Sequence, residues 1–165
     1  MSHCRNIFPV NVKSQIYYSL FQSCINYCHL VWGTTTQTNI EKLTLLQKRC
    51  FDRYIANEHY LAHTKPLFAK YKIINLDKMY DYRLLHSFRF SSPEHASLLC
   101  KMSELSEHPR SFNTRLFEKW IVPRARTNYT YQSITYRLPL LLNHLLNNNT
   151  DIYQMGRKSL LMHFL

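Results

Sequence analysis

The scarcity of glycine is the feature that most limits what this chain can fold into. Only Gly33 and Gly156 occur among its 165 residues, whereas the average usage of about 7% would place roughly a dozen in a chain of this length. Loops that cradle a phosphate group need several glycines, because the backbone must approach the ligand closely. The sequence therefore excludes P-loop NTPases, Rossmann dehydrogenases, protein kinases and the glycine-dependent RNA-recognition motif.

The hydrophobic pattern favours a mainly α-helical fold. Apolar residues recur at helical spacing between Pro9 and Trp32 and again between residues 38 and 57, where Thr38 and Glu41 are spaced as a capping box. The buried stripe predicted for this second helix includes Leu46 and Gln47. Further helices are predicted over residues 64–71, 76–90, 139–146 and 150–165, and the alternation in residues 132–137 predicts a strand of a short β-hairpin.

Charge divides the chain into regions. Lys and Arg total 21 against 10 Asp and Glu, for a formal net charge of +11, but residues 91–108 are acidic in balance and are bounded by Ser-Pro and His-Pro steps. We therefore predict a helical region over 1–90, a variable linker over 91–108, and a C-terminal segment over 109–165 with the short hairpin and a terminal helix.

The cysteines and the N-terminus indicate an intracellular chain, cytoplasmic or nuclear. The five cysteines are odd in number and scattered, which is typical of free thiols in a reducing compartment. The N-terminus is polar and has no apolar signal core. The longest apolar stretch, residues 138–146, is interrupted by polar residues and is too short to span a membrane, so no membrane partner is expected.

Residue types that perform catalysis are present but incompletely arranged. Cys24, Cys28 and His29 cluster, yet a tetrahedral zinc site would need His59 or His63 as well, so buried structural cysteines are the simpler interpretation. Asp77 and Asp81 share a helix face near a helix start, where they complement the helix dipole. We expect no metal, no cofactor and no catalytic residue in this chain.

Basic residues interleaved with tyrosines are compatible with nucleic-acid binding. Arginine and lysine contact phosphates, and tyrosine rings stack on bases. The alternative is a solvated basic surface with core tyrosines. The basic stretches are residues 48–53, 65–78 and 110–137, and the tyrosines among them are Tyr71, Tyr129, Tyr131 and Tyr136.

Several sequence blocks, taken in order, resemble one known family. They are IYYSLF (16–21), INYC (25–28), VWGT (31–34), LTLLQKR (43–49), YLAHTKPLF (60–68), KIINLDKMY (72–80), NTR (113–115), PRARTNY (123–129) and QSITYR (132–137). This series is similar to the region after the polymerase domain in reverse transcriptases of jockey-like non-LTR (LINE-type) retrotransposons. The resemblance covers residues 7 to 165.

The resemblance implies a thumb-like helical fragment of an RNA-directed DNA polymerase. The family's endonuclease and its polymerase domain with the metal-binding Asp-Asp motif have no counterpart here, so the chain is not expected to be an enzyme on its own. Expected partners are RNA or DNA and the polymerase domain of the parent polyprotein. The residues expected to contact the nucleic-acid backbone are Lys48, Arg49, Arg53, Arg124 and Arg126.

A different class of function is kept as the alternative. In that case the chain is a helical protein-interaction module without a nucleic-acid role, and its tyrosines together with residues 138–146 form the partner surface. The two hypotheses differ in where the exposed charge and the exposed apolar area should lie.

Overall fold

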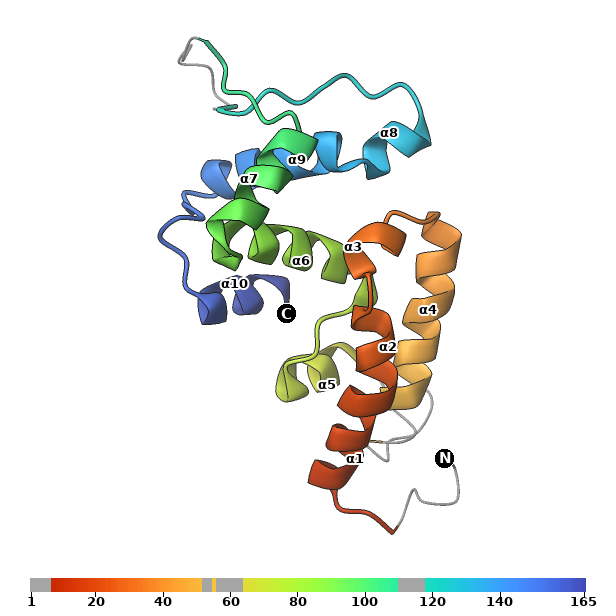
Figure 1. The fold of residues 1–165 in the computed structure, drawn as a ribbon. Coiled ribbons are helices and arrows are strands. Elements are labelled where there is room, and N and C mark those ends of the chain that lie inside the picture. Colours follow the sequence, from red (N-terminus) through yellow and green to blue (C-terminus); the bar gives the residue numbers. More distant parts are fainter. Residues whose placement is uncertain (1–6, 52–54, 56–63, 110–117) are drawn as a thin grey trace. The chain divides into compact units, whose positions relative to one another are not determined.

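The described part of the chain is mainly helical, which confirms the prediction of a mainly α-helical fold. The computed structural model describes all residues except 1–6, 52–54, 56–63 and 110–117 (Figure 1). The elements are α1 (Val10–Ile16), the π-helix η2 (Tyr17–Gln22), α2 (Ser23–Asn26), α3 (His29–Trp32), α4 (Gln37–Cys50), α5 (Thr64–Tyr71), α6 (Leu76–Phe90), α7 (Pro93–Met102), α8 (Asn128–Gln132), α9 (Ile134–Asn147) and α10 (Arg157–Phe164). None of the helices described is both long and apolar enough to cross a membrane.

The chain forms two compact units. The N-terminal unit comprises residues 1–80 with Leu165, and the C-terminal unit comprises residues 81–164, so the division lies within α6. The segment predicted as a linker contains α7, which begins after the N-cap Ser92 with Pro93 as its first residue. Both residues are typical helix-start signals. Within α7 no side chain is buried.

The first helical segment is interrupted before Trp32. The elements α1, η2 and α2 follow one another without a break, and the chain then turns at Tyr27 and Cys28 (Figure 1). Cys28 has a left-handed backbone conformation with φ of 47°. The Trp32 indole N–H donates a 2.7 Å hydrogen bond to the carbonyl oxygen of Tyr27, one of the groups that the helix end leaves without an intrahelical partner.

The buried face of α4 differs from the predicted stripe. The helix begins at Gln37, after Thr36, and not at the predicted capping box. Ile40, Thr44 and Gln47 are buried along it, whereas Leu46 is 48% exposed, so its predicted burial is wrong. The helix is turned toward Gln47 because the amide of that side chain hydrogen-bonds to groups elsewhere in the N-terminal unit.

An aromatic cluster forms much of the core of the N-terminal unit. The Phe51 ring packs edge-on against Phe68 and Tyr71, with ring centroids 5.3 and 5.1 Å apart. Tyr17 and Ile73 are buried in the same cluster. Edge-to-face packing of this kind adds to the stabilisation from burial of the rings themselves.

The predicted β-hairpin is wrong. Residues 132–137 contain the end of α8 and the start of α9, and Ser133 between them is extended and precedes the first turn of α9. The Arg137 N–H donates to the Ser133 carbonyl oxygen at 2.9 Å. The alternation in this short stretch competes with a longer helical pattern, since Leu138, Leu142 and Leu145 are all buried on α9.

The C-terminal helix is shorter than predicted. Helix α10 begins only at Arg157, because residues 151–154 form a turn. In that turn the Asp151 carboxylate accepts a hydrogen bond from the Tyr153 N–H at 2.9 Å, a local bond that competes with helix formation. Most buried apolar side chains of the C-terminal unit come from α6, α9, α10 and residues 151–155, and they include Leu84, Leu85, Leu138, Leu142, Leu145, Ile152, Met155, Leu160 and Phe164.

Candidate nucleic-acid interface

Two of the predicted basic residues lie on α4 in the N-terminal unit. The Arg49 side chain is exposed and that of Lys48 is partly buried. Within the residues described, neither has an ion-pair partner. Leu45 and Leu46 lie one helical turn before Arg49 and are 53% and 48% exposed, so this cation adjoins apolar surface. Arg53 lies outside the described residues.

The other two predicted basic residues lie in an extended segment of the C-terminal unit. Arg124 and Arg126 are both exposed, and each is without an ion-pair partner in the part of the chain that the structure describes. Their segment runs between Trp120 and α8, where Figure 1 shows it as an open trace without helical structure. Tyr129 and Tyr131 follow directly in α8, and their side chains are 88% and 47% exposed.

Hydrogen bonds hold this segment at its start. The buried Asn143 side chain on α9 accepts a hydrogen bond from the Trp120 N–H at 2.9 Å and donates one to the Trp120 carbonyl oxygen at 2.8 Å. Trp120 also forms an antiparallel bridge with Glu107. Together these bonds fix the backbone four residues before Arg124.

The end of the segment is held by a helix cap and a ring pair. Thr127 is the N-cap of α8, and its hydroxyl accepts a hydrogen bond from the Thr130 N–H. In the same region the Tyr131 and Tyr136 rings pack edge-on with centroids 5.0 Å apart. The two arginines therefore lie between two fixed points of the C-terminal unit.

Other basic residues of the predicted stretches form ion pairs within the C-terminal unit. Arg137 forms a bidentate ion pair with Asp81, with N–O distances of 2.7 and 2.6 Å. The Lys119 ammonium lies 3.2 Å from the Glu107 carboxylate. These charges are already compensated, so they are poorer phosphate ligands than Arg124 and Arg126. Arg110 and Arg115 lie outside the described residues.

The four tyrosines named with the basic stretches also fall into two groups, partly buried and exposed. Tyr71 is partly buried and packs against Phe51 in the core of the N-terminal unit. Tyr136 is partly buried against Tyr131. Of the four tyrosines named with the basic stretches, Tyr129 and Tyr131 are the ones with exposed side chains.

The candidate metal and carboxylate residues have other surroundings. Cys24 and Cys28 are exposed free thiols, whereas His29 is buried. No group of three metal-ligating side chains converges among the residues described, and His59 and His63 lie outside them. Asp77 is exposed in the first turn of α6, and Asp81 is the partner of Arg137.

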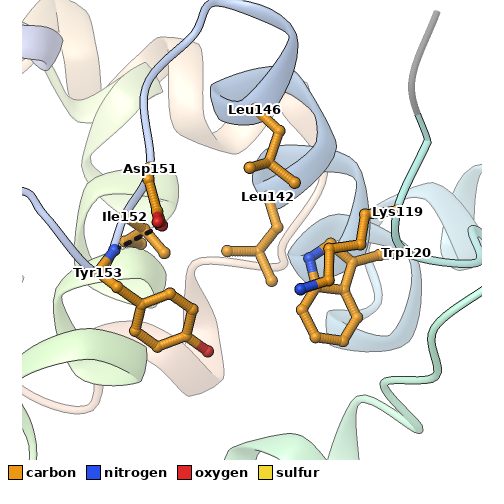
Figure 2. A pocket seen from close by; sticks show the side chains of 7 residues that line it. All are labelled: Lys119, Trp120, Leu142, Leu146, Asp151, Ile152 and Tyr153. Atoms are coloured by element: carbon orange, nitrogen blue, oxygen red, sulfur yellow. Dashed lines mark hydrogen bonds between the residues drawn. The ribbon is translucent and has the colours of Figure 1, made fainter.

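A small hollow lies in the C-terminal unit, beside the start of the basic segment. Figure 2 shows its seven lining residues, with the Trp120 and Tyr153 rings at two sides and Leu142 and Leu146 between them. Its volume is about 70 Å³, well below the roughly 300–1,000 Å³ of ordinary ligand pockets. The hollow can therefore take one side chain or a few water molecules rather than a whole nucleotide.

Comparison with known proteins supplies no relative. No protein-family model matches the chain, and neither a curated protein nor a solved structure matches it.

Proposed function

We propose that this chain is a non-catalytic C-terminal portion of a retrotransposon reverse transcriptase and that it binds the RNA or DNA backbone. The observation that carries the binding proposal is the exposure of Arg124 and Arg126 in a segment whose two ends are held by hydrogen bonds. Exposed guanidinium groups without a carboxylate partner are ready to make bidentate contacts with phosphates. Arg49, with Lys48 beside it, adds a second basic surface in the other unit.

The overall charge supports the same proposal. A formal net charge of +11 attracts polyanions over long range, and phosphate contacts release counterions. The ordered sequence blocks supply the retrotransposon part of the proposal. The polymerase domain of the parent polyprotein would be the second partner.

The test is oligonucleotide affinity as a function of salt. In a fluorescence anisotropy titration we expect the affinity of the wild-type chain to fall steeply between about 50 and 200 mM salt. The variant Arg124→Gln/Arg126→Gln should bind more weakly, with a slope of log affinity against log salt smaller by about 0.7 per lost phosphate contact on a single strand.

The matched control is Lys101→Gln/Lys158→Gln. Both lysines are exposed, on α7 and α10, and the variant removes the same number of charges as the arginine variant. Equal weakening by the two variants would mean that only net charge matters and would reject a specific site. Affinity that does not change with salt, or no binding at low salt, would reject the nucleic-acid proposal.

Exposed apolar side chains favour the protein-interaction module as the second candidate. In the N-terminal unit Tyr27 and Val31 are 78% and 75% exposed. The part of this hypothesis that uses residues 138–146 is weakened, because Leu138, Leu142 and Leu145 are buried. If the wild-type chain binds no oligonucleotide at low salt, the protein-interaction module is the candidate function that remains.

A further inference from the structure

Tyr129 has an unusual position for an aromatic residue. Its side chain is 88% exposed, the highest value among the large hydrophobic side chains in the described part of the chain. A ring in water contributes little to the stability of the fold, because the stabilisation from an apolar group follows the area that it buries. The ring face is accessible to a ligand.

The sequence around Tyr129 is cationic. Arg124 and Arg126 precede Tyr129 by five and three residues and are exposed. The sequence contains no Asp or Glu between Glu118 and Asp151. An anionic ligand that reaches the arginines therefore meets no nearby carboxylate along this stretch, and it lies close in sequence to an open aromatic face.

A second tyrosine extends the aromatic surface. Tyr131 is 47% exposed, and its ring packs edge-on against Tyr136 at 5.0 Å. This contact restricts the orientation of the Tyr131 ring while part of it stays in solvent. A restricted ring loses less conformational entropy on binding than a free one.

We infer that the arginine–tyrosine segment, residues 124–131, binds single-stranded RNA or DNA in preference to duplex. The inference rests on the proposed function and specifies its ligand class. A duplex offers phosphates to the arginines, but its bases are stacked inside and cannot reach a tyrosine ring. A single strand offers both phosphates and unpaired base faces, and stacking on an exposed ring tolerates any base.

The experiment compares one oligonucleotide sequence as a single strand and as a duplex, in ribose and deoxyribose forms. In anisotropy titrations at low salt, Tyr129→Ala should weaken single-strand binding by about 5- to 140-fold, the range for loss of one base stack. Duplex affinity should stay unchanged. Tyr129→Phe should behave as wild type because it keeps the ring face.

Tyr27→Ala is the matched control. Tyr27 is 78% exposed but belongs to the N-terminal unit, away in sequence from the two arginines. Its substitution should leave both affinities unchanged. As a measurement without substitution, the Tyr129 ring protons should shift upfield in nuclear magnetic resonance spectra when a short single strand is added.

The outcomes separate this inference from the proposed function. If Arg124→Gln/Arg126→Gln weakens binding to both forms while Tyr129→Ala changes neither, or changes both equally, the single-strand inference is overturned and the proposed function stands. An absent upfield shift under saturating single strand also overturns the inference. No binding of either form by the wild-type chain would reject the proposed function itself. A preference for ribose or for deoxyribose supports the inference equally, because stacking and phosphate contacts are common to both.

Discussion

At the scale of single residues, Gln47 shows how one polar side chain can organise a small unit. It is fully buried, and its amide nitrogen donates to the Tyr17 hydroxyl at 3.2 Å and to the Ile74 carbonyl oxygen at 3.1 Å. Its amide oxygen accepts from the Leu76 N–H at 3.1 Å. Buried polar groups stabilise a fold only when they are satisfied, so these bonds depend on one another.

Substitution of Gln47 should therefore destabilise the N-terminal unit strongly. We expect Gln47→Leu to lower the free energy of unfolding by about 2–5 kcal/mol, because buried backbone groups at Ile74 and Leu76 lose their partner. Urea denaturation measures this loss. Gln37→Leu, at an exposed position on the same helix, is the control and should change stability little. Equal stability of the two variants would contradict the role of the hydrogen bonds.

The two glycines have different reasons to be glycine. A Cβ atom at Gly33 would lie 2.5 Å from the His29 carbonyl oxygen and 2.8 Å from the Tyr80 ring. At Gly156 a Cβ would meet nothing within 4 Å. The backbone at Gly33 therefore lies too close to its neighbours for a side chain, whereas the space around Gly156 can hold one.

Alanine substitution distinguishes the two positions. Gly33→Ala should cost about 1–3 kcal/mol, since backbone must shift to relieve the contact. Gly156→Ala should change the free energy of unfolding by no more than about 1 kcal/mol in either direction. Thermal unfolding of both variants provides the comparison. A larger loss at Gly156 than at Gly33 would contradict the packing argument.

The surroundings of His86 predict that the C-terminal unit is sensitive to acid. Burial lowers the pKa of His86 below its usual value, and the positive charges of Arg157 and Arg83 lower it further. Its ring lies between those of Tyr82 and Phe90 on α6, at 5.7 and 5.2 Å. Because the unfolded chain binds a proton more readily at this site, the stabilisation is present above the unfolded pKa of about 6.5 and is lost as the pH falls through the folded value.

We expect unfolding midpoints of the wild type to fall as the pH drops below about 6.5, and His86→Leu to reduce that dependence. Urea titrations at several pH values test this. His95→Leu, at an exposed position on α7, should leave the wild-type dependence in place. A pH profile unchanged by His86→Leu would show that other groups cause the acid sensitivity.

At the scale of elements, the Asn143 side chain joins α9 to the segment that carries the candidate interface. Its amide pairs with both backbone groups of Trp120, as a neighbouring strand would. A short extended segment without a sheet needs such a partner, because buried backbone groups must be hydrogen-bonded.

Removing this side chain should release the segment. Asn143→Ala is expected to lower the free energy of unfolding by about 1–3 kcal/mol. The fluorescence emission maximum of Trp120 should shift to longer wavelength, because the ring becomes hydrated. The measurement needs a Trp32→Phe background, because the chain has two tryptophans. Asn147→Ala, exposed on the same helix, is the control. Unchanged emission in Asn143→Ala would show that Trp120 is held by other contacts.

At the scale of the whole molecule, the excess of positive charge opposes folding and favours polyanion binding. Self-repulsion of a chain with a net charge of +11 is reduced by salt, and so is its attraction to phosphates. Thermal stability should therefore rise with sodium chloride over the range in which oligonucleotide affinity falls. The thermal stability of the variant Lys101→Glu/Lys158→Glu should depend less on salt, because the variant has a lower net positive charge. A thermal stability that falls as salt is added would contradict the proposed effect of self-repulsion on folding.

Local signals in the sequence were sufficient for several elements. The predicted helices over 64–71 and 76–90 coincide with α5 and α6. Helix α7 also has its signals in the sequence, Ser92 followed by Pro93, although the acidic balance of this region and the Ser-Pro and His-Pro steps that bound it predict a linker. Exposure of Arg49, Arg124 and Arg126 agrees with the general rule that charged side chains stay in solvent.

Tertiary structure decided which residues of a pattern are buried and which charges are paired. Periodicity alone placed Leu46 in the core, but the hydrogen bonds of Gln47 turn α4 so that Thr44 is buried instead. Arg137 pairs with Asp81 across 56 residues of sequence, which removes it from the basic surface. The sequence by itself determined a helical, glycine-poor and basic chain, because helix propensity and charge are local properties. Partners distant in sequence depend on the path of the chain, so only the fold could show that Arg137 is paired and that Tyr129, unlike Tyr71, is exposed.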